Sequence, residues 1–412
     1  MKLINRKLGD GIHVKHGFAF LGEHFSDQGK YILLTPGNFY EEGGFKSRPE
    51  KDRYYIGIFP SDYLLKKDDL IVAMTEQVPG LLGSSAFIPK DNTYLHNQRL
   101  GLVDEIDKDF FDKKYLYHLF NSRGVRSQIY GSASGTKVRH TSPGRIYKVK
   151  ILVPDVVKQK EISSIIENYN QLIRTNRRRI QLLEKSARFL FREWFVYFRF
   201  PGHEKVKIVD SVPDGWKKTT LGNVANRIKK NYSINDEDLN LVDLARINSR
   251  TLAVTDVGVA SDLETARIIF EKDDILFSSI RPYLHKVVLA PFRGITNTSI
   301  FVIRAKNPIY RAYITLLLFS NYAIQFANQH STGTKMPVVK WGSVSKLPAL
   351  IPHQTIMEDF QNMVWPMLEQ IQLAYFQNRK LAHARDLLLL RLMSGAIEVS
   401  ESNIEISKEA ET

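Results

Sequence analysis

Two short loops in this sequence combine the residue types that bind phosphate. Gly135-Thr136-Lys137 recurs 198 positions later as Gly333-Thr334-Lys335. Glycine-rich loops expose backbone N–H groups and a lysine adds positive charge, so such loops can hold an anion. The nucleotide-binding P-loop, however, needs four residues between its glycines and a Ser or Thr after its lysine. Three residues separate Gly131 from Gly135, and Val138 follows the lysine. The pattern therefore favours either a loop that meets a DNA backbone or a plain turn.

A second stretch could in principle carry methyl transfer. Asn307-Pro308-Ile309-Tyr310 resembles the Asn-Pro-Pro-Tyr motif of amino-methyltransferases, in which the loop holds the target amine for attack on the methyl donor. One proline of that motif is missing, no glycine-rich cofactor loop precedes it after a strand, and the first half of the chain has no equivalent. A strand-to-helix turn is the favoured interpretation.

Composition excludes several kinds of site. The chain has no cysteine, which removes thiol catalysis, disulfides and cysteine-ligated metals. Its 11 histidines show no metal-binding spacing such as HExxH. The net charge of +14 favours nucleic acid as a partner, with an acidic protein or anionic lipid as alternatives. The sequence shows neither a signal peptide nor a membrane span, so we expect a cytoplasmic protein.

Long helices are expected to position these loops. Apolar residues alternate at spacings of four and three along residues 159–199, which is typical of a coiled-coil seam. Because one such helix would expose its seam to water, it needs a partner, and a second copy occurs 198 positions later. Each copy contains asparagine, which can fix helix register when buried. The helix-pairing seam is predicted to contain Ile166, Ile173, Asn176, Ile180 and Leu183 in the first copy, and Val364, Ile371, Asn378, Leu381 and Leu388 in the second.

Each long helix follows a globular stretch of strands and one helix. The strand-like runs and helical stretches are expected at 31–34, 54–59, 70–74, 100–103, 113–130 and 148–153, then at 239–245, 266–270, 275–280, 287–290, 300–303 and 310–328. The second stretch repeats the helices and junctions of the first but differs inside the globular part, as after Thr75 and Ile280. A fixed scaffold with variable loops suggests two reading heads on one frame.

The fold class is therefore predicted to be an α/β (α+β) tandem repeat. Two globular domains would be separated by two long antiparallel coiled-coil helices. Trp365-Pro366 should kink the second helix or mark its true start. The expected domains are a first globular domain at 1–154, a central long helix at 155–200, a connector at 201–220, a second globular domain at 221–350, a distal long helix at 351–395 and a polar tail at 396–412.

This arrangement resembles the specificity subunit of type I restriction-modification enzymes. The resemblance covers nearly the whole chain, and its motifs are specific in combination although each is weak alone. The motifs that carry it are Leu8-Gly9-Asp10, Gly17-Phe18-Ala19-Phe20, Asp214-Gly215-Trp216, Leu221-Gly222-Asn223, the paired Gly-Thr-Lys loops, the helix entries after Pro154 and Pro352, and the run from Leu387 to Gly395.

The resemblance implies a division of labour. Each globular part would be a target recognition domain that reads one half of a split double-stranded DNA sequence, and the paired helices would fix the distance between the halves. The chain would have no catalysis and bind no cofactor of its own. It would recruit two methyltransferase subunits that bind S-adenosylmethionine, and through them restriction subunits that use ATP and magnesium.

Base-reading residues follow from the preferred pairings of arginine with guanine and of asparagine or glutamine with adenine. The candidate DNA-binding residues are Gln98, Arg99, Lys137 and Arg139 in the first domain, and Arg281, Tyr283, Thr298 and Lys335 in the second. Two other functions stay open at this point. One is a DNA adenine methyltransferase that uses Asn307 to Tyr310, and the other is a non-catalytic coiled-coil adaptor.

Overall fold

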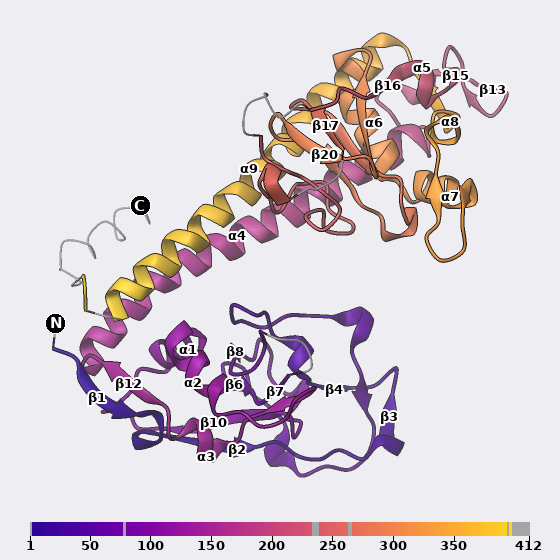
Figure 1. Ribbon diagram of the computed structural model, residues 1–412. Helices are drawn as coiled ribbons and strands as arrows, with labels where there is room; N and C mark the ends of the chain where they lie inside the picture. Colours follow the sequence, from indigo (N-terminus) through magenta and orange to yellow (C-terminus); the bar gives the residue numbers. More distant parts are fainter. Residues whose placement is uncertain (1, 77–79, 233–238, 263–265, 394, 398–412) are drawn as a thin grey trace. The chain divides into compact units, whose positions relative to one another are not determined.

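The computed structural model describes residues 2–76, 80–232, 239–262, 266–393 and 395–397 (Figure 1). Most of the polar tail expected at 396–412 therefore lies outside the described residues. The chain forms two compact units. Unit 1 is Met1–Asn170 with His383–Thr412, and unit 2 is Gln171–Ala382. The two long helices are not elements of their own in this division, because each unit takes a part of both.

Unit 1 is built on an antiparallel four-stranded sheet. Its strand order is β2-β10-β6-β8, and a separate antiparallel pair joins β1 to β12. The strands are β1 (Ile4–Lys7), β2 (Ile12–His16), β6 (Leu70–Ala73), β8 (Ser85–Phe87), β10 (Leu100–Ile106) and β12 (Lys150–Val153). Strand β6 is buried along its whole length, as expected for a central strand covered on both faces.

Unit 2 repeats this frame. Its sheet has the order β16-β21-β18-β19, and β15 pairs with β24 as β1 does with β12. The strands are β15 (Lys217–Thr220), β16 (Ala225–Ile228), β18 (Ile275–Ser278), β19 (Val287–Leu289), β21 (Ile300–Ala305) and β24 (Pro348–Ile351). The residues expected as a connector at 201–220 thus contain β15, and also the small hairpin of β13 (Ile208–Val209) and β14 (Val212–Pro213).

The Leu-Gly motif that opens each frame has a packing reason. Leu8 N donates to Val149 O and Gly9 N to Tyr147 O, while Leu221 N donates to Leu347 O and Gly222 N to Ser345 O. A Cβ on Gly9 would lie 2.5 Å from the Cβ of Tyr147. Glycine therefore lets the two backbones approach closely enough to close the frame.

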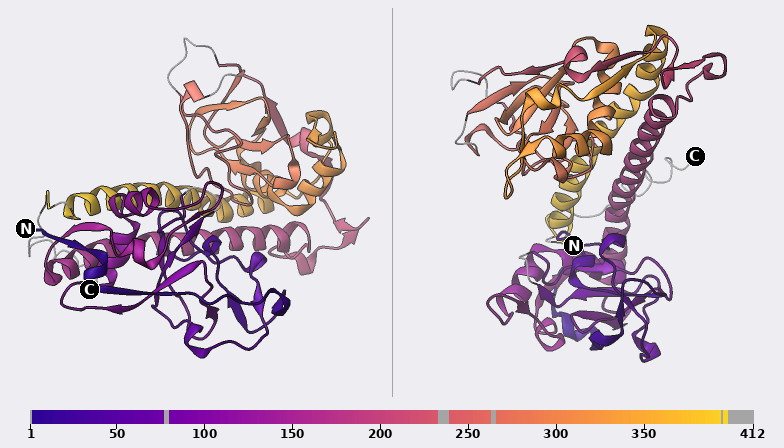
Figure 2. Two further views of the ribbon diagram at one scale, coloured as in Figure 1. Left: turned by 60° about the horizontal axis from the view of Figure 1, so that its bottom comes forward. Right: turned by 90° about the vertical axis from the view of Figure 1, so that its right-hand side faces the viewer.

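Two consecutive helices occupy each stretch that the sequence predicts to be helical. The stretches predicted at 113–130 and 310–328 are helical, but Ser122 and Ser320 divide each of them in two. Both serines have extended backbones and accept a hydrogen bond from the N–H three residues ahead, so each ends one helix and caps the next. The helices are α1 (Lys113–Asn121), α2 (Arg123–Gly131), α6 (Arg311–Phe319) and α7 (Asn321–Gln329). Helix α1 lies against β6 and β8 (Figure 1), and α6 lies against β19 and β21. Figure 2 shows the ribbon from two further sides.

The units differ in the strands added to the frame. Unit 1 adds a second four-stranded sheet, β3-β5-β4-β9, whereas unit 2 adds the pair β17-β20. These strands are β3 (Phe25–Ser26), β4 (Tyr31–Leu33), β5 (Tyr54–Tyr55), β9 (Tyr94–Leu95), β17 (Arg267–Phe270) and β20 (Gly294–Asn297). The strand expected at 239–245 is only an isolated bridge from Leu241 to Gly258 and Ile295.

Helices α4 (Val156–Phe195) and α9 (Gln354–Met393) each have 40 residues. Within unit 2, Asn176 Nδ2 donates to Gln377 Oε1 at 3.4 Å and Arg179 Nη2 to Gln370 Oε1 at 2.9 Å. Within unit 1, Arg385 Nη1 donates to Asn170 Oδ1 at 2.9 Å. Partner numbers fall as α4 numbers rise, so the helices are antiparallel, and the predicted fold class is confirmed.

Five of the ten predicted seam residues are buried, and the other five are half-buried. Ile166, Ile173, Ile180, Val364 and Ile371 are buried, while Asn176, Leu183, Asn378, Leu381 and Leu388 are half-buried. Pro366 lies inside α9 and does not mark its start. Since proline has no N–H, the carbonyl of Asn362 lacks its helical donor at that turn.

The cores of the two units use different side chains on the long helices. In unit 2 the end of α4 supplies Phe191, Trp194 and Phe195, which pack around Phe360 of α9 with ring centroids 4.8 to 6.5 Å apart. These aromatic residues build a core and are not exposed for stacking on bases. In unit 1 the equivalent places hold aliphatic residues, among them Ile162 and Leu392.

Candidate nucleic-acid interface

Each frame brings three separate segments together beside one end of its sheet. In unit 1, Met74 N donates to Arg99 O at 3.0 Å and Thr141 N to Met74 O at 2.9 Å. In unit 2, Ser279 N donates to Ser299 O and Val339 N to Ser279 O, both at 2.9 Å. We call these sets loop edge 1 (residues 74–76, 98–99 and 132–141) and loop edge 2 (residues 279–284, 298–299 and 331–339). The same hydrogen bonds thus assemble both edges.

The Gly-Thr-Lys loops are the tips of β-hairpins in these edges. Ser134 and His140 exchange two backbone hydrogen bonds in edge 1, and β22 (Ser331–Thr332) pairs with β23 (Val338–Val339) in edge 2. Gly135 has φ +94° and Gly333 φ +98°, a region that other residues rarely adopt. The threonine and lysine after each glycine are exposed. The loops are therefore tight turns that present Thr and Lys outward.

Edge 1 gathers the four residues predicted from the first domain. Gln98 and Arg99 are exposed just before β10, and Lys137 is exposed at the hairpin tip. Arg139 is half-buried in β11 (Arg139–His140), which pairs with β7 (Thr75–Glu76). Its guanidinium lies 4.1 Å from the ring centroid of Tyr130. The edge therefore offers hydrogen-bonding groups and positive charge from adjacent segments.

Edge 2 gathers the four residues predicted from the second domain. Thr298 is exposed at the turn before β21, and Lys335 is exposed at the hairpin tip. Arg281 N donates to Pro337 O at 2.7 Å, which joins the segment after β18 to the hairpin. Tyr283, in η8 (Pro282–Leu284), is 52% exposed. The Nε of Arg281 is buried and has no hydrogen-bond partner among the residues that the structure describes.

Several residues that shape the edges escaped the sequence analysis. Arg145 Nη1 donates to Ser134 Oγ at 2.8 Å and to His140 O at 3.2 Å, so it braces hairpin 1. Glu76 is 4% exposed, and its carboxylate accepts backbone N–H groups of Gly80, Leu81 and Leu82. A single Glu or Arg in a sequence carries no pattern that predicts hydrogen bonds to a neighbouring loop. In edge 2, the exposed Leu284 and Met336 could have been suspected as apolar residues beside predicted contact residues.

Two buried histidines beside the edges carry no charge at neutral pH. His96 lies behind edge 1, and burial lowers its pKa to about 4. Its Nε2 lies 2.9 Å from Leu100 O, and because a carbonyl can only accept, this nitrogen carries the proton. Burial also lowers the pKa of His285 in unit 2. Both rings are therefore neutral at pH 7 and serve packing and hydrogen bonding.

The stretch from Asn307 to Tyr310 is a strand-to-helix turn. The Asn307 side chain accepts a hydrogen bond from Ile309 N at 3.1 Å and caps the short helix η9 (Pro308–Tyr310). The favoured interpretation of this motif as a turn thus agrees with its geometry. Within the part of the chain that the structure describes, no group of three or more His, Cys, Asp or Glu could hold a metal ion. No helix in that part is long and apolar enough to cross a membrane.

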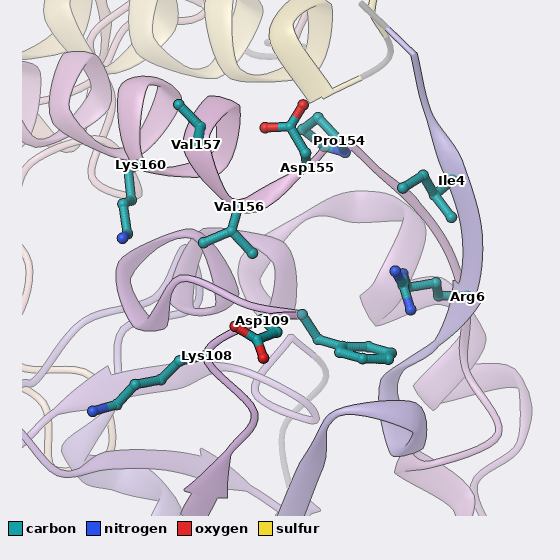
Figure 3. A pocket seen from close by; sticks show the side chains of 10 residues that line it. Ile4, Arg6, Lys108, Asp109, Pro154, Asp155, Val156, Val157 and Lys160 are labelled. Carbon is teal, nitrogen blue, oxygen red and sulfur yellow. The ribbon is translucent and has the colours of Figure 1, made fainter.

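A pocket of about 370 Å³ lies in unit 1 where α4 begins (Figure 3). Lys108, Lys160 and Arg6 line it together with Asp109 and Asp155, so its charges are nearly balanced. The Arg6 guanidinium lies 3.9 Å from the ring centroid of Phe110. Asp155 Oδ1 already accepts Lys158 N at 2.9 Å. None of the predicted DNA-binding residues lines this pocket.

Comparison with known proteins bears on the family. Residues 3–185 match the model of the type I restriction modification DNA specificity domain. The chain is 23% identical over 321 residues to the MjaIX specificity subunit, from a type I restriction enzyme of Methanocaldococcus jannaschii, and the match covers 73% of each protein. It is also 23% identical over 301 residues to the EcoDI specificity subunit of Escherichia coli, with 66% of each covered.

A solved structure shares the fold. The S subunit of a type I restriction-modification system from M. genitalium matches with a TM-score of 0.64 and 14% identity, and the match covers 97% of each chain. At that identity the likeness concerns the fold alone. Together, the family match and the named relatives confirm the resemblance that the sequence motifs indicate.

Proposed function

We propose that this chain, a relative of the specificity subunits of type I restriction enzymes, reads a split double-stranded DNA sequence with one loop edge for each half. The observation that carries the proposal is the repeated edge. The same backbone hydrogen bonds assemble it twice, and each time it presents Lys or Arg together with Gln, Thr or Tyr side chains. A chain with net charge +14 is suited to a polyanion.

The side chains of the edges match the two tasks of DNA binding. Lys137 and Lys335 stand at hairpin tips, where a flexible ammonium group can neutralise phosphate without reading sequence. Gln98 and Arg99 lie on the neighbouring segment of edge 1, and these residue types pair with adenine and guanine in the major groove. Phosphate contacts would thus position each edge while its other residues select bases.

The paired helices would set the distance between the two half-sites. At 1.5 Å per residue, a helix of 40 residues is roughly 60 Å long. Half-sites one DNA turn apart lie about 34–36 Å from centre to centre, which a rod of that length can span. Asn176 and Asn378 in the seam would fix the register of the helices and hence the spacer length.

The chain would act as a non-catalytic subunit in the cytoplasm. It would bind two methyltransferase subunits, which hold S-adenosylmethionine, and through them restriction subunits, which use ATP and magnesium. The names of the relatives, all specificity subunits of type I restriction enzymes, support this assignment. The turn geometry of Asn307 gives no reason to assign methyl transfer to this chain.

Footprinting of the chain in complex with its methyltransferase subunits tests the proposal. Two separated blocks of protection are expected on DNA that carries the recognised sequence, which methylation mapping in cells would identify. Uniform protection or none would contradict it and favour a coiled-coil adaptor. Binding of S-adenosylmethionine by the isolated chain would instead support a methyltransferase.

A second experiment addresses the spacing. Insertion of one heptad into both α4 and α9 should lengthen the unread spacer and leave both half-site sequences unchanged.

Asn176→Leu should strengthen helix pairing but relax spacer selectivity, measured as methylation on DNA with altered spacers. Changed half-sites after the insertion would contradict the role of the helices, and unchanged selectivity would make Asn176 only a tolerated polar residue.

A further inference from the structure

Edge 2 exposes apolar side chains that phosphate binding does not explain. Tyr283 is 52% exposed, Leu284 36% and Met336 50%. Single exposed apolar residues are ordinary on protein surfaces. These residues, however, stand on two segments that the hydrogen bond from Arg281 N to Pro337 O joins, and Lys335 directly precedes Met336 in the sequence. We call Tyr283, Leu284 and Met336 the apolar tip.

The loop that carries Tyr283 and Leu284 is held in one conformation. Arg281 and His285, at its two ends, both have left-handed backbones, with φ of 47° and 53°. Non-glycine residues keep such conformations only where the surroundings enforce them, and they gather at functional sites. Leu284 N donates to Arg281 O and His285 N to Pro282 O, so the loop closes on itself.

The far end of this loop is anchored to the frame. The His285 ring, 4% exposed, lies 2.8 Å from Phe319 O through Nε2 and packs edge-on against the Phe319 ring at 4.7 Å. Arg250 N donates to His285 O at 2.9 Å. Because the loop is already ordered, a partner that meets the apolar tip need not order it first.

The surroundings of the apolar tip indicate its partner. Lys335 and Arg281 place positive charge beside it, which suits a ligand with a phosphate backbone. In the major groove of DNA, the only apolar group on a base edge is the 5-methyl group of thymine. A rigid apolar side chain flanked by cations can therefore meet a thymine methyl while the cations meet phosphates.

Edge 1 has other features where the structure describes it. The segment after β6 continues into β7, where the buried Glu76 carboxylate accepts backbone N–H groups of Gly80, Leu81 and Leu82. Among the described residues of edge 1, the exposed side chains, such as Gln98, Arg99 and Lys137, are polar. These residues offer hydrogen-bonding groups, whereas edge 2 also offers apolar ones.

We propose that the apolar tip reads the 5-methyl group of a thymine in the half-site bound by unit 2. This inference rests on the proposed function and adds to it a contact class for one half-site. Edge 2 thereby adds to its hydrogen bonds an apolar contact in which Leu284 and Tyr283 determine specificity.

Deoxyuridine is the probe, because it lacks the thymine methyl and keeps the same hydrogen-bonding edge. Duplexes carrying the recognised sequence would have each thymine replaced in turn, and binding by the complex with methyltransferase subunits would be measured. At one or more positions in the half-site of unit 2, we expect about fourfold weaker binding, the effect of one lost buried methyl. Leu284→Ala and Tyr283→Ala should bind the thymine and uracil duplexes equally.

Ile208→Ala is the matched control. Ile208 is 59% exposed in the β13–β14 hairpin of unit 2. Its substitution should leave the discrimination between thymine and uracil unchanged. The half-site of unit 2 is the one whose protection a Gly333→Ala substitution reduces.

Three results would overturn the inference while the unaltered complex still protects two blocks of DNA. The first is that no position is sensitive to uracil, and the second is that the Leu284 and Tyr283 variants are as sensitive to uracil as the unaltered complex. The third is that these variants keep DNA discrimination but no longer assemble with the methyltransferase subunits. The last would identify the apolar tip as a protein contact. Loss of both protected blocks in the unaltered complex would instead contradict the proposed function itself.

Discussion

Unit 1 and unit 2 use the same strand order for their central sheets but add different strands to it. Unit 1 inserts the sheet β3-β5-β4-β9, and unit 2 inserts the pair β17-β20. The frame is fixed by buried strands, by the two serine-capped helix breaks and by the closed Leu-Gly junctions. The inserts have no such common constraint, and the loop edges share their backbone hydrogen bonds but not their side chains. The comparison shows that one scaffold can present two different surfaces, as the proposed reading of two different half-sites requires.

The largest expected effect tests whether the two units have separate cores. Phe360 and Ile162 occupy equivalent places on α9 and α4, and both are fully buried. Phe360→Ala removes the ring that packs between Trp194 and Phe195 and should lower the free energy of unfolding of unit 2 by about 3–5 kcal/mol. Ile162→Ala should lower that of unit 1 by about 2–5 kcal/mol.

Hydrogen exchange measured peptide by peptide would locate these losses. Leu373→Ala on α9, where the side chain is 57% exposed, should change little and serves as the control. Equal loss of protection in both units after Phe360→Ala would mean that they unfold as one body, and the comparison of two cores would then fail.

The hairpin tips should respond unequally to the same substitution. Gly135 and Gly333 both have positive φ, where alanine is strained by about 1–3 kcal/mol. A Cβ on Gly135 would also lie 2.0 Å from Val138 O, whereas a Cβ on Gly333 would lie 3.0 Å from Met336 O. Gly135→Ala should therefore weaken protection of its half-site by more than about tenfold, and Gly333→Ala should weaken the other half-site less.

Footprinting each half-site separately measures this difference. The unaffected half-site in each variant is the internal control for assembly and protein concentration. An equal loss at both half-sites in either variant would show that the hairpins do not act on separate parts of the DNA.

How far the sequence could predict the fold depended on how many residues carry a pattern. The seam from Ile166 to Leu183 and its copy predicted the helix pair, because a coiled-coil period persists over many turns. The breaks at Ser122 and Ser320 were missed, since serine occurs often in helices and only its extended backbone shows that it caps the next one. The run 239–245 has the residue types of a strand, but the structure pairs little of it.

The candidate site was predictable in place but not in detail. The Gly-Thr-Lys repeat located both hairpins, and residues flanking β10 and β21 met them at the edges. The apolar tip was missed in part because the loop that exposes it depends on the left-handed backbones of Arg281 and His285. No local pattern distinguishes such a backbone from an ordinary turn. Glu76 was missed because its partners are backbone N–H groups, which every sequence contains.

Acid should distinguish the units through buried histidine. Burial lowers the pKa of His118 in unit 1 to about 3, and nearby Arg385 contributes. The folded state therefore keeps the ring neutral, while the unfolded chain takes up a proton below its pKa of about 6.5. The stabilisation of the neutral form is complete above that pH. It is lost by about 1.4 kcal/mol per pH unit as the pH falls towards 3.

At pH 5 the free energy of unfolding of unit 1 should be lower by about 2 kcal/mol because of His118. Hydrogen exchange of unit 1 at pH 7 and pH 5, corrected for intrinsic exchange rates, measures this loss. His118→Gln, which cannot titrate, should flatten that change. The lowered pKa of His96 adds to the loss in unit 1, and His285 contributes in unit 2. An unaltered pH response in the Gln variant would mean that other groups cause the acid sensitivity.

The smallest expected effect separates charge from sequence reading within the two edges. Lys137→Ala and Lys335→Ala each remove one exposed cation from a hairpin tip. If each lysine neutralises one phosphate, each variant should lower the slope of log affinity against log salt by about 1 and weaken all sequences alike. Gln98→Ala should instead keep the slope and relax selection at one base pair. A lysine variant that changed base preference and left the salt slope intact would show that its hairpin contacts bases. Phosphate neutralisation and base recognition would then not belong to separate segments of the edge.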